Sequence, residues 1–508
     1  MEPVPRPARY PFSTNGIRRD SDGIARYEDL PRSLVAVLRH WAETTPGSEA
    51  VIEVGGPRLT YRELYEQASR VAGGLRAEGL SSGDRVALRY PAGVQWVLAF
   101  WGTLLAGGIP VAVNTRFTEH EVSFVLGDAD VTIDLGPDTV LPDGEPTAPS
   151  DPSSGDVAAI FYTSGTTGHP KGVPTTHEAF LSNAETMIRC LGETREIGAR
   201  LRTLISVPLF HVTGCNSQLL TAAYAGGASI VLPALDLQVL LDTIQRERIT
   251  FLVTVPAVYA LLLRHPGFAG ADTSSVRWVG YGGAPIAASL VHALRDAFPR
   301  CQVFNGYGMT ETASLMTVLP NDEAAEHADS VGYSVPVVDL AVAPLDQPNR
   351  GELLARGPNV MTGYWRRPDA NAEALAGGWL HTGDIVEVDA DGRVVIVDRL
   401  KDIINRGGEN ISSVEVENAL SDAPGVAEVT AVGVPDDVMG EKVGVVLVPT
   451  DPARLDVDAV LAHARVRLAD YKLPEYVCVL DSPLPRNAGG KVRKNEVRQM
   501  AVWRSTTS

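Results

Sequence analysis

One loop of glycines, hydroxyls and a single lysine limits what this chain can fold into more than any other stretch. It occupies residues 162–173 and reads YTSGTTGHPKGV. The apolar run at 157–161 predicts a buried strand before the loop, and the amphipathic run at 178–191 predicts a helix after it. Glycines allow backbone N–H groups to approach an anion, the hydroxyls add donors, and Lys171 adds a positive charge. The stretch therefore predicts a triphosphate site between a strand and a helix.

This loop does not have the spacing of a Walker loop. A Walker loop needs a glycine directly before the lysine, where Pro170 stands, and a hydroxyl directly after it, where Gly172 stands. An ordinary solvated turn is the alternative, but the run of hydroxyls and glycines before Pro-Lys-Gly is unlike a typical turn. We therefore interpret the loop as a phosphate grip of another kind. Its candidate residues are Thr163, Ser164, Gly165, Thr166, Thr167, Gly168 and Lys171.

The charge balance excludes several classes of partner. Lys and Arg number 44 against 62 Asp and Glu, which gives a formal net charge of −18 over 508 residues. Nucleic acids and anionic membrane surfaces need clustered Lys and Arg, so neither is expected as a partner. Local basic sites for an anionic cofactor are compatible with this balance.

The start of the chain and its cysteines predict a location. The first residues, MEPVPR, lack the basic and then apolar pattern of a secretory signal. The cysteines are scattered, without the paired spacing of a zinc or redox site, and are expected to be buried thiols in a reducing compartment. They are Cys190, Cys215, Cys301 and Cys478. We expect a cytoplasmic protein.

An uncharged run at 96–113 reaches the lower length limit of a membrane span. Two glycines and Pro110 divide it, which predicts a helix at 94–106 and a strand at 109–113. Such a pair is typical of an α/β core that is covered on all sides. The sequence therefore predicts no membrane span.

Strand and helix patterns alternate through the first two thirds of the chain. Thr60 with Glu63, and Thr118 with Glu121, form capping boxes that predict helix starts. Such alternation is typical of parallel, doubly wound sheets, so two α/β subdomains are expected. The predicted strands lie at 51–54, 85–90, 109–113, 131–135, 157–161, 203–207, 229–232, 250–255, 276–281 and 302–304, with further helices at 237–248 and 287–297.

After residue 332 the pattern changes to short strands. Runs at 385–389 and 394–398 flank an Asp-Gly pair, which is a strong hairpin signal, and predict a small β subdomain. Beyond Lys401 a compact pattern of helices and strands predicts a separate small α+β unit.

Two segments carry no regular pattern. Residues 1–32 are rich in Pro, Arg and Asp and are expected to form an arm draped over the surface. Residues 136–156 are rich in Pro, Asp, Gly, Ser and Thr and are expected to form a mobile surface loop.

Seven further stretches are too polar or too rich in glycine for their surroundings. They are PLFH at 208–211, YGGAP at 281–285, NGYGMTE at 305–311, WLHTGD at 379–384, DRLKD at 398–402, GGENI at 407–411 and GGK at 489–491. With the opening loop, and in this order, the set resembles the adenylate-forming superfamily, especially its acyl- and aryl-CoA synthetases. The resemblance extends over nearly the whole chain, from about residue 34 to residue 494.

The resemblance implies a fold and a reaction. The expected fold is α/β, with a large N-terminal domain (1–399) of two doubly wound subdomains and a small β subdomain, a hinge (400–402) and a small mobile α+β domain (403–508). In the expected reaction a carboxylate attacks the α-phosphate of Mg-ATP to give acyl-AMP and pyrophosphate. The thiol of coenzyme A then takes the acyl group. The resemblance leaves room for a homodimer.

The resemblance also implies roles around the phosphates. The loop at 163–168 and Lys171 would hold the β- and γ-phosphates, and Thr310 would reach the α-phosphate. Glu311 would bind Mg²⁺, which needs few protein carboxylates when phosphate oxygens complete its shell. Taken alone, a glutamate in a loop would be an ordinary surface residue, so this role depends on its neighbours in the motif.

Further implied roles concern the nucleoside. Tyr307 would lie on the adenine, and Asp384, an acceptor-only group, would bind both ribose hydroxyls. Arg399 would reach the ribose from the other side. Glycine backbone and short side chains would line the adenine and acyl site, because a missing side chain lets a ligand approach the main chain. These residues are Gly282, Gly283, Ala284, Asn305, Gly306 and Gly308.

The catalytic roles are implied in the same way. Lys491 would bridge the carboxylate and the α-phosphate, where charge develops during adenylation. Lys401 would stand at the hinge and permit the small domain to rotate before the second step. His211 would lie at the acyl pocket. The residues expected along the path of the CoA thiol are Gly407, Gly408 and Glu409.

Two alternatives stay open. One keeps the adenylation but passes the acyl group to an amine or to a carrier-protein arm. The other is a non-catalytic nucleotide-binding regulator, whose signature would be the loss of Lys491 or Glu311, and both are present. The acid itself, whether fatty, aromatic or polyketide-derived, is not readable from the sequence.

Overall fold

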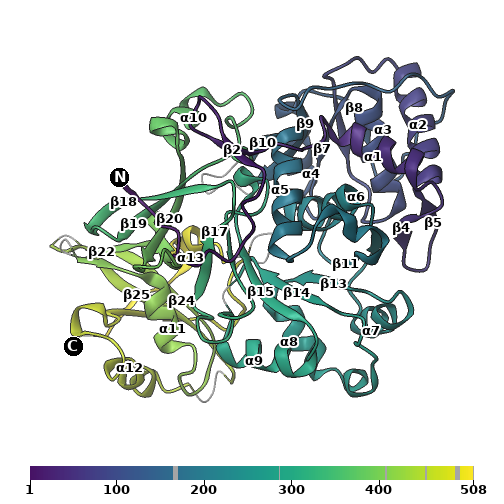
Figure 1. Ribbon diagram of the computed structural model, residues 1–508. Helices are drawn as coiled ribbons and strands as arrows, with labels where there is room; N and C mark the ends of the chain where they lie inside the picture. Colours follow the sequence, from purple (N-terminus) through teal and green to yellow (C-terminus); the bar gives the residue numbers. More distant parts are fainter. Residues whose placement is uncertain are drawn as a thin grey trace.

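The computed structural model describes residues 1–163, 170–284, 286–406, 409–436, 438–451, 455–486 and 492–506, with the backbone alone for Asp346, Lys401, Glu409 and Asn410. Part of the predicted site lies outside the described residues: Ser164, Gly165, Thr166, Thr167, Gly168, Gly407, Gly408 and Lys491. The remaining site residues are carried by sheets that pack against helices from distant parts of the chain (Figure 1).

The first sheet has the strand order β10–β9–β7–β6–β8. Its strands are β6 (Arg85–Leu88), β7 (Ile109–Ala112), β8 (Val131–Leu135), β9 (Val157–Thr163) and β10 (Lys171–Thr176), with helices α2 (Tyr61–Ala77), α3 (Val94–Ala106) and α4 (Glu119–Asp128). Both predicted capping boxes are present, with Thr60 at the start of α2 and Thr118 at the start of α4. The strands β6 to β9 pair in parallel, as the alternation predicts.

The uncharged run at 96–113 is part of the core. Helix α3 is buried along almost its whole length and ends at Gly107, whose φ of 84° lies in the left-handed region that glycine adopts without strain. Strand β7 follows at once, inside the sheet. Of the helices in the described parts of the chain, none is long and apolar enough to cross a membrane.

The structure differs from the prediction in the segment after the glycine-rich loop at 162–173, which we call the phosphate loop. A strand, β10, follows the loop instead of a helix, and it pairs antiparallel to β9 with Lys171 opposite Thr163. Helix α5 (His177–Cys190) begins only after this strand. Pro174 hid the strand from the sequence pattern, because proline is rare in sheets. It is tolerated here because β10 is an edge strand. The loop therefore connects two strands of a hairpin.

The second sheet has the order β1–β18–β19–β20–β21–β17–β16–β15–β14–β13–β11–β12–β4–β5. Its strands are β4 (Glu49–Glu53), β5 (Arg58–Thr60), β11 (Arg202–Ile205), β12 (Ala228–Val231), β13 (Phe251–Thr254), β14 (Trp278–Gly282), β15 (Gln302–Tyr307), β16 (Thr317–Leu319), β17 (Ser330–Ser334), β18 (Asp339–Gln347), β19 (Arg350–Arg356), β20 (Leu380–Val388) and β21 (Val394–Arg399), with β1 from the arm. Helices on this part of the chain include α1 (Leu34–Thr44), α6 (Thr221–Ala225), α7 (Leu237–Arg246), α8 (Pro256–Arg264) and α9 (Ala288–Ala297).

This order changes two details of the prediction. The second α/β unit and the small β subdomain share one continuous sheet, because β16 and β17 pair in series between β15 and β21. Strand β4, predicted at the start of the first unit, pairs in parallel with β12 of the second sheet. The predicted hairpin is formed by β20 and β21, and Gly392 in its turn has a φ of 83°.

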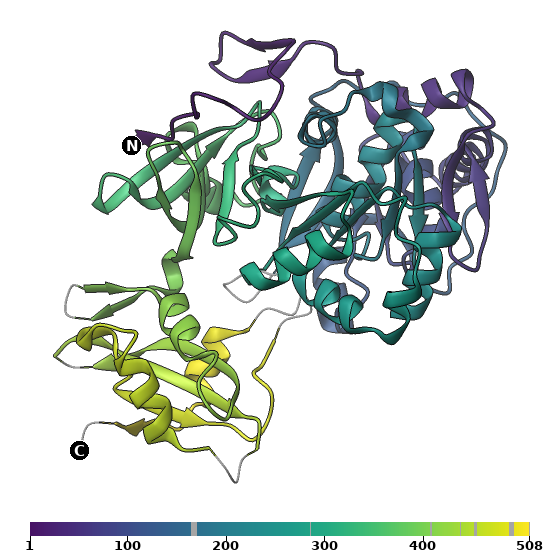
Figure 2. The ribbon, with the colours of Figure 1, turned by 60° about the horizontal axis from the view of Figure 1, so that its bottom comes forward.

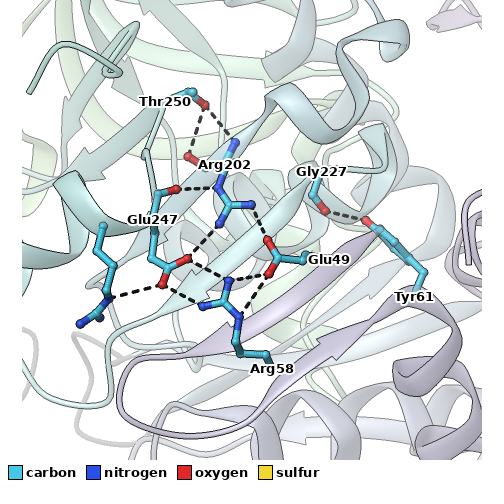
Figure 3. Close-up of polar contacts among 8 residues, drawn as sticks. Glu49, Arg58, Tyr61, Arg202, Gly227, Glu247 and Thr250 are labelled. Atoms are coloured by element: carbon cyan, nitrogen blue, oxygen red, sulfur yellow. Dashed lines mark hydrogen bonds and ion pairs between the residues drawn. The ribbon is translucent and has the colours of Figure 1, made fainter. Parts of the chain in front are cut away.

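A network of ion pairs fastens β4 and β5 to this sheet (Figure 3). The Glu247 carboxylate lies 2.8 Å from a guanidinium nitrogen of Arg58 and 3.0 Å from one of Arg202. The Glu49 carboxylate lies 2.7 Å from a guanidinium nitrogen of Arg202 and 2.5 Å from one of Arg58. The hydrogen bond from Arg58 is the largest influence that lowers the pKa of Glu247, whose side chain is 6% exposed. Residues far apart in the sequence are thereby held together at this edge of the sheet.

The cysteines are free thiols. Cys215 and Cys478 are buried, as predicted, whereas Cys190 and Cys301 are only partly buried. Burial raises the pKa of Cys301 to about 12, so this thiol stays protonated at neutral pH.

The N-terminal arm lies over the surface, as predicted, and also forms a strand that pairs with the longer sheet. Strand β1 (Glu2–Pro3) adds antiparallel to β18, and Tyr10 donates a hydrogen bond of 2.6 Å to the Ser334 carbonyl. Strands β2 (Ile17–Arg19) and β3 (Ala25–Tyr27) form a hairpin. From this hairpin Arg19 reaches Asp339 on β18 and Arg26 reaches Glu178 on α5. The arm therefore spans from β18 to α5, as the purple trace in Figure 1 also shows.

The segment 136–156 contains neither helix nor strand, as predicted. It packs closely on α2. A Cβ atom on Gly73 would lie 2.2 Å from the carbonyl oxygen of Glu145, and the Gly144 N–H donates to the Arg70 carbonyl at 3.1 Å. The glycines of α2 thus allow this segment to approach the helix backbone. Its predicted mobility remains a prediction.

The C-terminal part has a sheet of order β23–β22–β25–β26–β27, with β24 also paired to β25. Its elements are β22 (Ile404–Arg406), β23 (Glu409–Ile411), β24 (Val426–Asp436), β25 (Gly440–Pro449), β26 (Tyr476–Val479), β27 (Arg504–Ser505), α11 (Ser413–Leu420), α12 (Val457–Arg465) and α13 (Lys494–Met500). Figure 2 shows this part below the remainder of the molecule, entered from β21. Asp398 at the end of β21 accepts hydrogen bonds from the N–H (2.5 Å) and hydroxyl (2.9 Å) of Ser413, which fastens the start of α11.

His177 makes the stability of the fold depend on pH. This buried residue accepts a hydrogen bond of 3.3 Å from the Leu34 N–H at the start of α1, and burial lowers its pKa from 6.5 to about 4. In the unfolded chain His177 therefore binds a proton below about pH 6.5, whereas in the folded chain it binds one only near pH 4. The free energy of unfolding therefore keeps the full contribution of neutral His177 above pH 6.5. It falls by up to about 3 kcal/mol as the pH approaches 4.

A His177→Gln variant would test this, because glutamine keeps an acceptor but does not titrate. Urea unfolding of both proteins between pH 7.5 and 4.5 is the measurement. We expect the wild type to lose more stability than the variant as the pH falls. Parallel pH dependences would show that His177 is not the titrating group.

Candidate active site

The predicted site residues collect where parallel strands end. Strands β11, β13, β14 and β15 run parallel in the second sheet. Gly282 ends β14, Tyr307 ends β15, and His211 follows β11. Ligands of open α/β sheets bind at this edge, outside the carboxyl ends of the strands. The strand order therefore brings together segments that are far apart in the sequence.

Asp384 is the buried acceptor of a cluster of three side chains. It pairs with Arg399 across β20 and β21, and its side chain is 4% exposed. Arg399 Nε lies 2.7 Å from one carboxylate oxygen, and the Tyr307 hydroxyl donates to the other at 2.5 Å. Burial and the neighbouring carboxylate raise the pKa of Tyr307 well above its usual value, so the phenol remains a donor. The two donors fix the orientation of the Asp384 carboxylate.

The predicted contacts of Asp384 and Arg399 with a ribose stay predictions. In the structure, the side chains of Arg399 and Asp384 are in direct contact. The reason is the strand register, which places the two residues opposite each other in the hairpin of β20 and β21. The predicted contact of Tyr307 with adenine concerns its ring, whereas the structure commits its hydroxyl to Asp384.

Glycines lie at the end of β14 and just after β15. A Cβ atom on Gly282 would lie 2.3 Å from the Gly306 carbonyl oxygen, and one on Gly308 would lie 1.4 Å from the Ser314 carbonyl oxygen. Both positions therefore exclude any side chain. Gly283 and Ala284 are exposed just beyond β14, while Asn305 is buried and donates to the Ser330 carbonyl at 3.2 Å. Gly282 and Gly308 thus let backbone segments of the chain approach each other closely, and Asn305 supports the sheet.

Glu311 and Lys171 are joined through an aromatic ring. Glu311 lies in the short helix η4 (Thr310–Thr312), which also carries Thr310, and accepts a hydrogen bond of 2.9 Å from the Tyr364 hydroxyl. Lys171, at the start of β10, places its Nζ 4.9 Å from the centre of the Tyr364 ring. Burial, with Glu311 as the next cause, raises the pKa of Tyr364 above its usual range. The predicted metal ligand and the lysine of the phosphate loop thus share one neighbour.

The turn after η4 has an unusual backbone. Ala313 and Ser314 have φ angles of 50° and 115°, which residues with side chains rarely adopt. The Asn216 side-chain amide donates to the Ala313 carbonyl, and the Ser217 hydroxyl lies 2.6 Å from that of Ser314. Asn216 and Ser217 belong to η2 (Thr213–Leu220), a π-helix, and such turns are frequent at functional sites. Strain of this kind often accompanies functional sites.

His211 lies at the entrance of this π-helix. Its ring is 4.7 Å from the ring of Phe210, and its carbonyl accepts a hydrogen bond of 3.0 Å from the Cys215 N–H. It is partly buried, at the same edge of the sheet as Gly282 and Tyr307. His211 thus follows the carboxyl end of β11, and its role at an acyl pocket stays a prediction.

Two predicted residues belong to the connection with the C-terminal part. Lys401 lies in the short helix η6 (Leu400–Asp402), two residues after Arg399, and Glu409 begins β23. Their side chains are not among the described atoms. Thr163 closes the hairpin of the phosphate loop, where its hydroxyl donates to the Lys171 carbonyl at 3.4 Å.

The sequence analysis missed three polar residues that support this site. Tyr364 contacts Glu311, Asn216 holds the strained turn, and Asn359 donates to the carbonyls of Thr312 and Leu315 at 2.8 Å each. The polar run TGCNSQ between apolar residues at 213–218 was an available signal for Asn216. For Tyr364 and Asn359 the sequence offers only a glycine-rich connection, so tertiary contacts were needed to find them.

The residues around Glu311 fit a magnesium ion that depends on its nucleotide. Within the described parts of the chain, no group of three or more His, Cys, Asp or Glu side chains could hold a metal by itself. Mg²⁺ commonly takes one or two protein carboxylates and completes its shell with water and phosphate oxygens. A single carboxylate, that of Glu311, which shares Tyr364 as a neighbour with Lys171, is compatible with that mode of binding.

Comparisons with known proteins cover most of the chain. The sequence pattern described as AMP-binding enzyme matches residues 38–140 and 133–365, and the pattern described as AMP-binding enzyme C-terminal domain matches residues 415–491. A feruloyl-CoA synthase from Amycolatopsis sp. is 38% identical over 90% of this chain and 97% of its own length. The long-chain-fatty-acid–CoA ligase FadD13 from Mycobacterium tuberculosis is 33% identical over 91% of this chain and 97% of its own.

Solved structures agree with these sequence matches. ATP-bound MatB from Rhodopseudomonas palustris is 31% identical, with a TM-score of 0.83 over 92% of this chain and 98% of its own. The o-succinylbenzoate CoA synthetase MenE from Bacillus subtilis, solved with its acyl-adenylate intermediate, is 29% identical, with a TM-score of 0.82 over 92% of this chain and 98% of its own. The mixed α/β fold with a large N-terminal and a small C-terminal part is shared with both.

Proposed function

The chain belongs to the AMP-binding enzyme family, and from this premise we propose that it is an AMP-forming carboxylate–CoA ligase. It would activate a carboxylic acid with ATP, release pyrophosphate, and transfer the acyl group from acyl-AMP to coenzyme A. The observation that carries the proposal is a pair of contacts at the end of β15: Tyr307, its last residue, contacts Asp384 on β20, and Glu311, just beyond it, shares Tyr364 as a neighbour with Lys171 on β10. The CoA-ligase names of the relatives support the thiol as the acceptor.

Different residues would bind the different parts of ATP. Asp384 would accept the ribose hydroxyls, because Arg399 and Tyr307 hold its carboxylate in one orientation. Lys171 would neutralise charge on the β- and γ-phosphates, and Glu311 would hold Mg²⁺. A bound magnesium ion supplies further neutralisation of the phosphates.

The first chemical step follows from this placement. An oxygen of the substrate carboxylate attacks the α-phosphorus, the bond to the bridging oxygen breaks, and pyrophosphate leaves with the bonding electrons. Thr310 and Lys491 would stabilise the charge that develops on the α-phosphate and the carboxylate. His211 would border the acyl group, while Gly282, Gly283, Ala284, Gly306 and Gly308 would offer backbone to the adenylate.

The second step transfers the acyl group. The CoA sulfur attacks the acyl carbonyl carbon, the thiol proton is lost, and AMP departs. Gly407, Gly408 and Glu409 are proposed to border the path of the thiol.

A panel of carboxylic acids tests this function. Pyrophosphate release is measured with and without CoA, and the products are identified by mass spectrometry. Fatty, aromatic and small polyketide acids form the arms of the panel, since the named relatives differ in their acids. Acid-dependent pyrophosphate release with a CoA thioester is the expected result. Release without thioester would favour an amine or a carrier protein as the acceptor, and no release with any acid would favour the non-catalytic regulator.

We propose a division of the chain into an N-terminal domain (1–399), a hinge (400–402) and a C-terminal domain (403–508). It is supported by the end of β21 at Arg399, by the short helix η6, and by the start of a new sheet at Ile404. Rotation at Lys401 would replace Lys491 by residues 407–409 at the active site between the two steps.

A Lys401→Pro variant would test the hinge. Proline fixes φ and disfavours the helical conformation of the preceding Leu400, so rotation should be impaired. We expect thioester formation to fall by about tenfold or more, with adenylation within about threefold of wild type. Lys401→Ala is the matched control, because it removes the side chain and leaves the backbone free. Equal rates of thioester formation in all three proteins would contradict the hinge.

A cytoplasmic location is also part of the proposal, supported by the free thiols of all four cysteines, which are typical of a reducing compartment. A homodimer, which the resemblance allows, would be detected by light scattering of the purified protein.

A further inference from the structure

The Tyr364 side chain contacts two charged groups of the proposed phosphate site, Glu311 and Lys171. Its hydroxyl donates to Glu311 Oε1 at 2.9 Å, and its ring faces the Lys171 ammonium at 4.9 Å. An ammonium over an aromatic face is attracted by the ring quadrupole. A phenol that donates to a carboxylate fixes the position of that carboxylate and leaves its second oxygen available.

The backbone around Tyr364 joins the same two elements. The Met361 N–H donates to the Glu311 carbonyl at 2.7 Å, and the Trp365 N–H donates to the Gly172 carbonyl on β10 at 2.8 Å. The segment 361–365 is thus fastened to η4 at one end and to the phosphate hairpin at the other. Asn371 holds the backbone of Tyr364 itself, accepting from its N–H at 2.6 Å and donating to its carbonyl at 3.1 Å.

We propose that Tyr364 is a positioning residue that couples metal binding to phosphate binding: its hydroxyl fixes the Glu311 carboxylate for Mg²⁺, and its ring holds the Lys171 ammonium toward the phosphates. This inference rests on the proposed function, because it takes Glu311 as the metal ligand. It adds a residue to which the sequence motifs assign no role. Residues that orient a metal ligand commonly change metal affinity by 10- to 100-fold when they are removed.

Two substitutions separate the two contacts. Tyr364→Phe removes the hydroxyl and keeps the ring, whereas Tyr364→Leu removes both. The matched control is Tyr333→Phe, because the Tyr333 hydroxyl also donates to a carboxylate, that of Glu323 at 2.9 Å, but on β17 outside the proposed site. Thermal unfolding of all four proteins checks that each is folded.

The first measurement is direct binding of ATP by calorimetry, with Mg²⁺ and with EDTA. In the wild type and in Tyr333→Phe, magnesium should tighten ATP binding. In Tyr364→Phe this magnesium-dependent gain should shrink by about tenfold, while ATP binding in EDTA stays near the wild-type value. In Tyr364→Leu the binding in EDTA should weaken as well, by about three- to tenfold, because the ammonium loses its aromatic neighbour.

The second measurement is the magnesium dependence of acid-dependent pyrophosphate release. Tyr364→Phe should need about tenfold more Mg²⁺ for half-maximal rate and should recover most of the rate at saturating Mg²⁺. A magnesium-dependent gain within about twofold of wild type in Tyr364→Phe would overturn the inference. If ATP binding weakened equally in EDTA and in Mg²⁺ for both variants, the inference would also be overturned, because the loss of a residue with only a structural role has that effect. Absence of pyrophosphate release in the wild type would instead refute the proposed function, while the calorimetric result would still decide the role of Tyr364.

Discussion

A Lys491→Ala variant is expected to lose adenylation by roughly 10²- to 10³-fold or more, and to keep thioester formation from supplied acyl-AMP. The reason is that charge develops on the carboxylate and α-phosphate oxygens only in the first step, and removal of one positioned donor at such a centre has an effect of about this size. In the second step the negative charge departs with AMP, and the proposed rotation has already moved Lys491 away. Pyrophosphate release and thioester formation are measured separately in single-turnover reactions.

Lys494 provides the matched control for this experiment. It lies three residues further on, and its ammonium contacts the Ser413 hydroxyl at 2.6 Å and Glu417 at 2.9 Å. Lys494→Ala should therefore lower thermal stability without separating the two half-reactions. If Lys491→Ala slowed both half-reactions equally, its assigned role in the first step would be wrong.

The second large effect is expected for Asp384→Asn. The kcat/KM for ATP should fall by about 10²- to 10³-fold, because two hydrogen bonds from ribose to a charged acceptor are weakened at once. The change also leaves the Arg399 guanidinium without its carboxylate. A comparison of ATP with its 2′,3′-dideoxy analogue identifies the cause, since the wild type should discriminate strongly between them and the variant only weakly.

Asp389→Asn is a suitable control for Asp384. Asp389 lies just beyond β20, at the turn of the same hairpin, and also pairs with an arginine, Arg393 at 2.5 Å, but it is exposed and has no proposed contact with the nucleotide. It should behave as the wild type with both nucleotides. Asp384→Asn with undiminished discrimination between ATP and the dideoxy analogue would exclude Asp384 as the ribose acceptor.

Local signals in the sequence predicted most of the individual elements. The capping boxes at Thr60 and Thr118 mark real helix starts, because the hydrogen bonds of a cap involve residues only three positions apart. The predicted helix at 94–106 has the same bounds as α3, since Gly107 terminates it. The failures are non-local. Strand β10 was hidden by Pro174, and the pairing of β4 with β12 joins residues whose patterns carry no mark of their partner.

The same limit applies to the site. The resemblance supplied Asp384, Arg399 and Tyr307 as separate residues, but their mutual contact depends on the register of β20 and β21 and on the end of β15. Tyr364 was not predicted, because its importance comes only from two neighbours that are distant in the sequence. Motifs thus indicated which residues to examine, and tertiary packing determined which of them touch.

Strand β1 has a consequence for the outer edge of the longer sheet. Edge strands expose unpaired N–H and C=O groups that can recruit other chains into aggregates. The pairing of Glu2 and Pro3 with β18, followed by the Val4 N–H to the Leu340 carbonyl at 3.0 Å, covers part of that edge, and Pro3 and Pro5 provide few donors for a further strand. Truncation of these few residues would therefore leave unpaired backbone groups of β18 at the edge of the sheet.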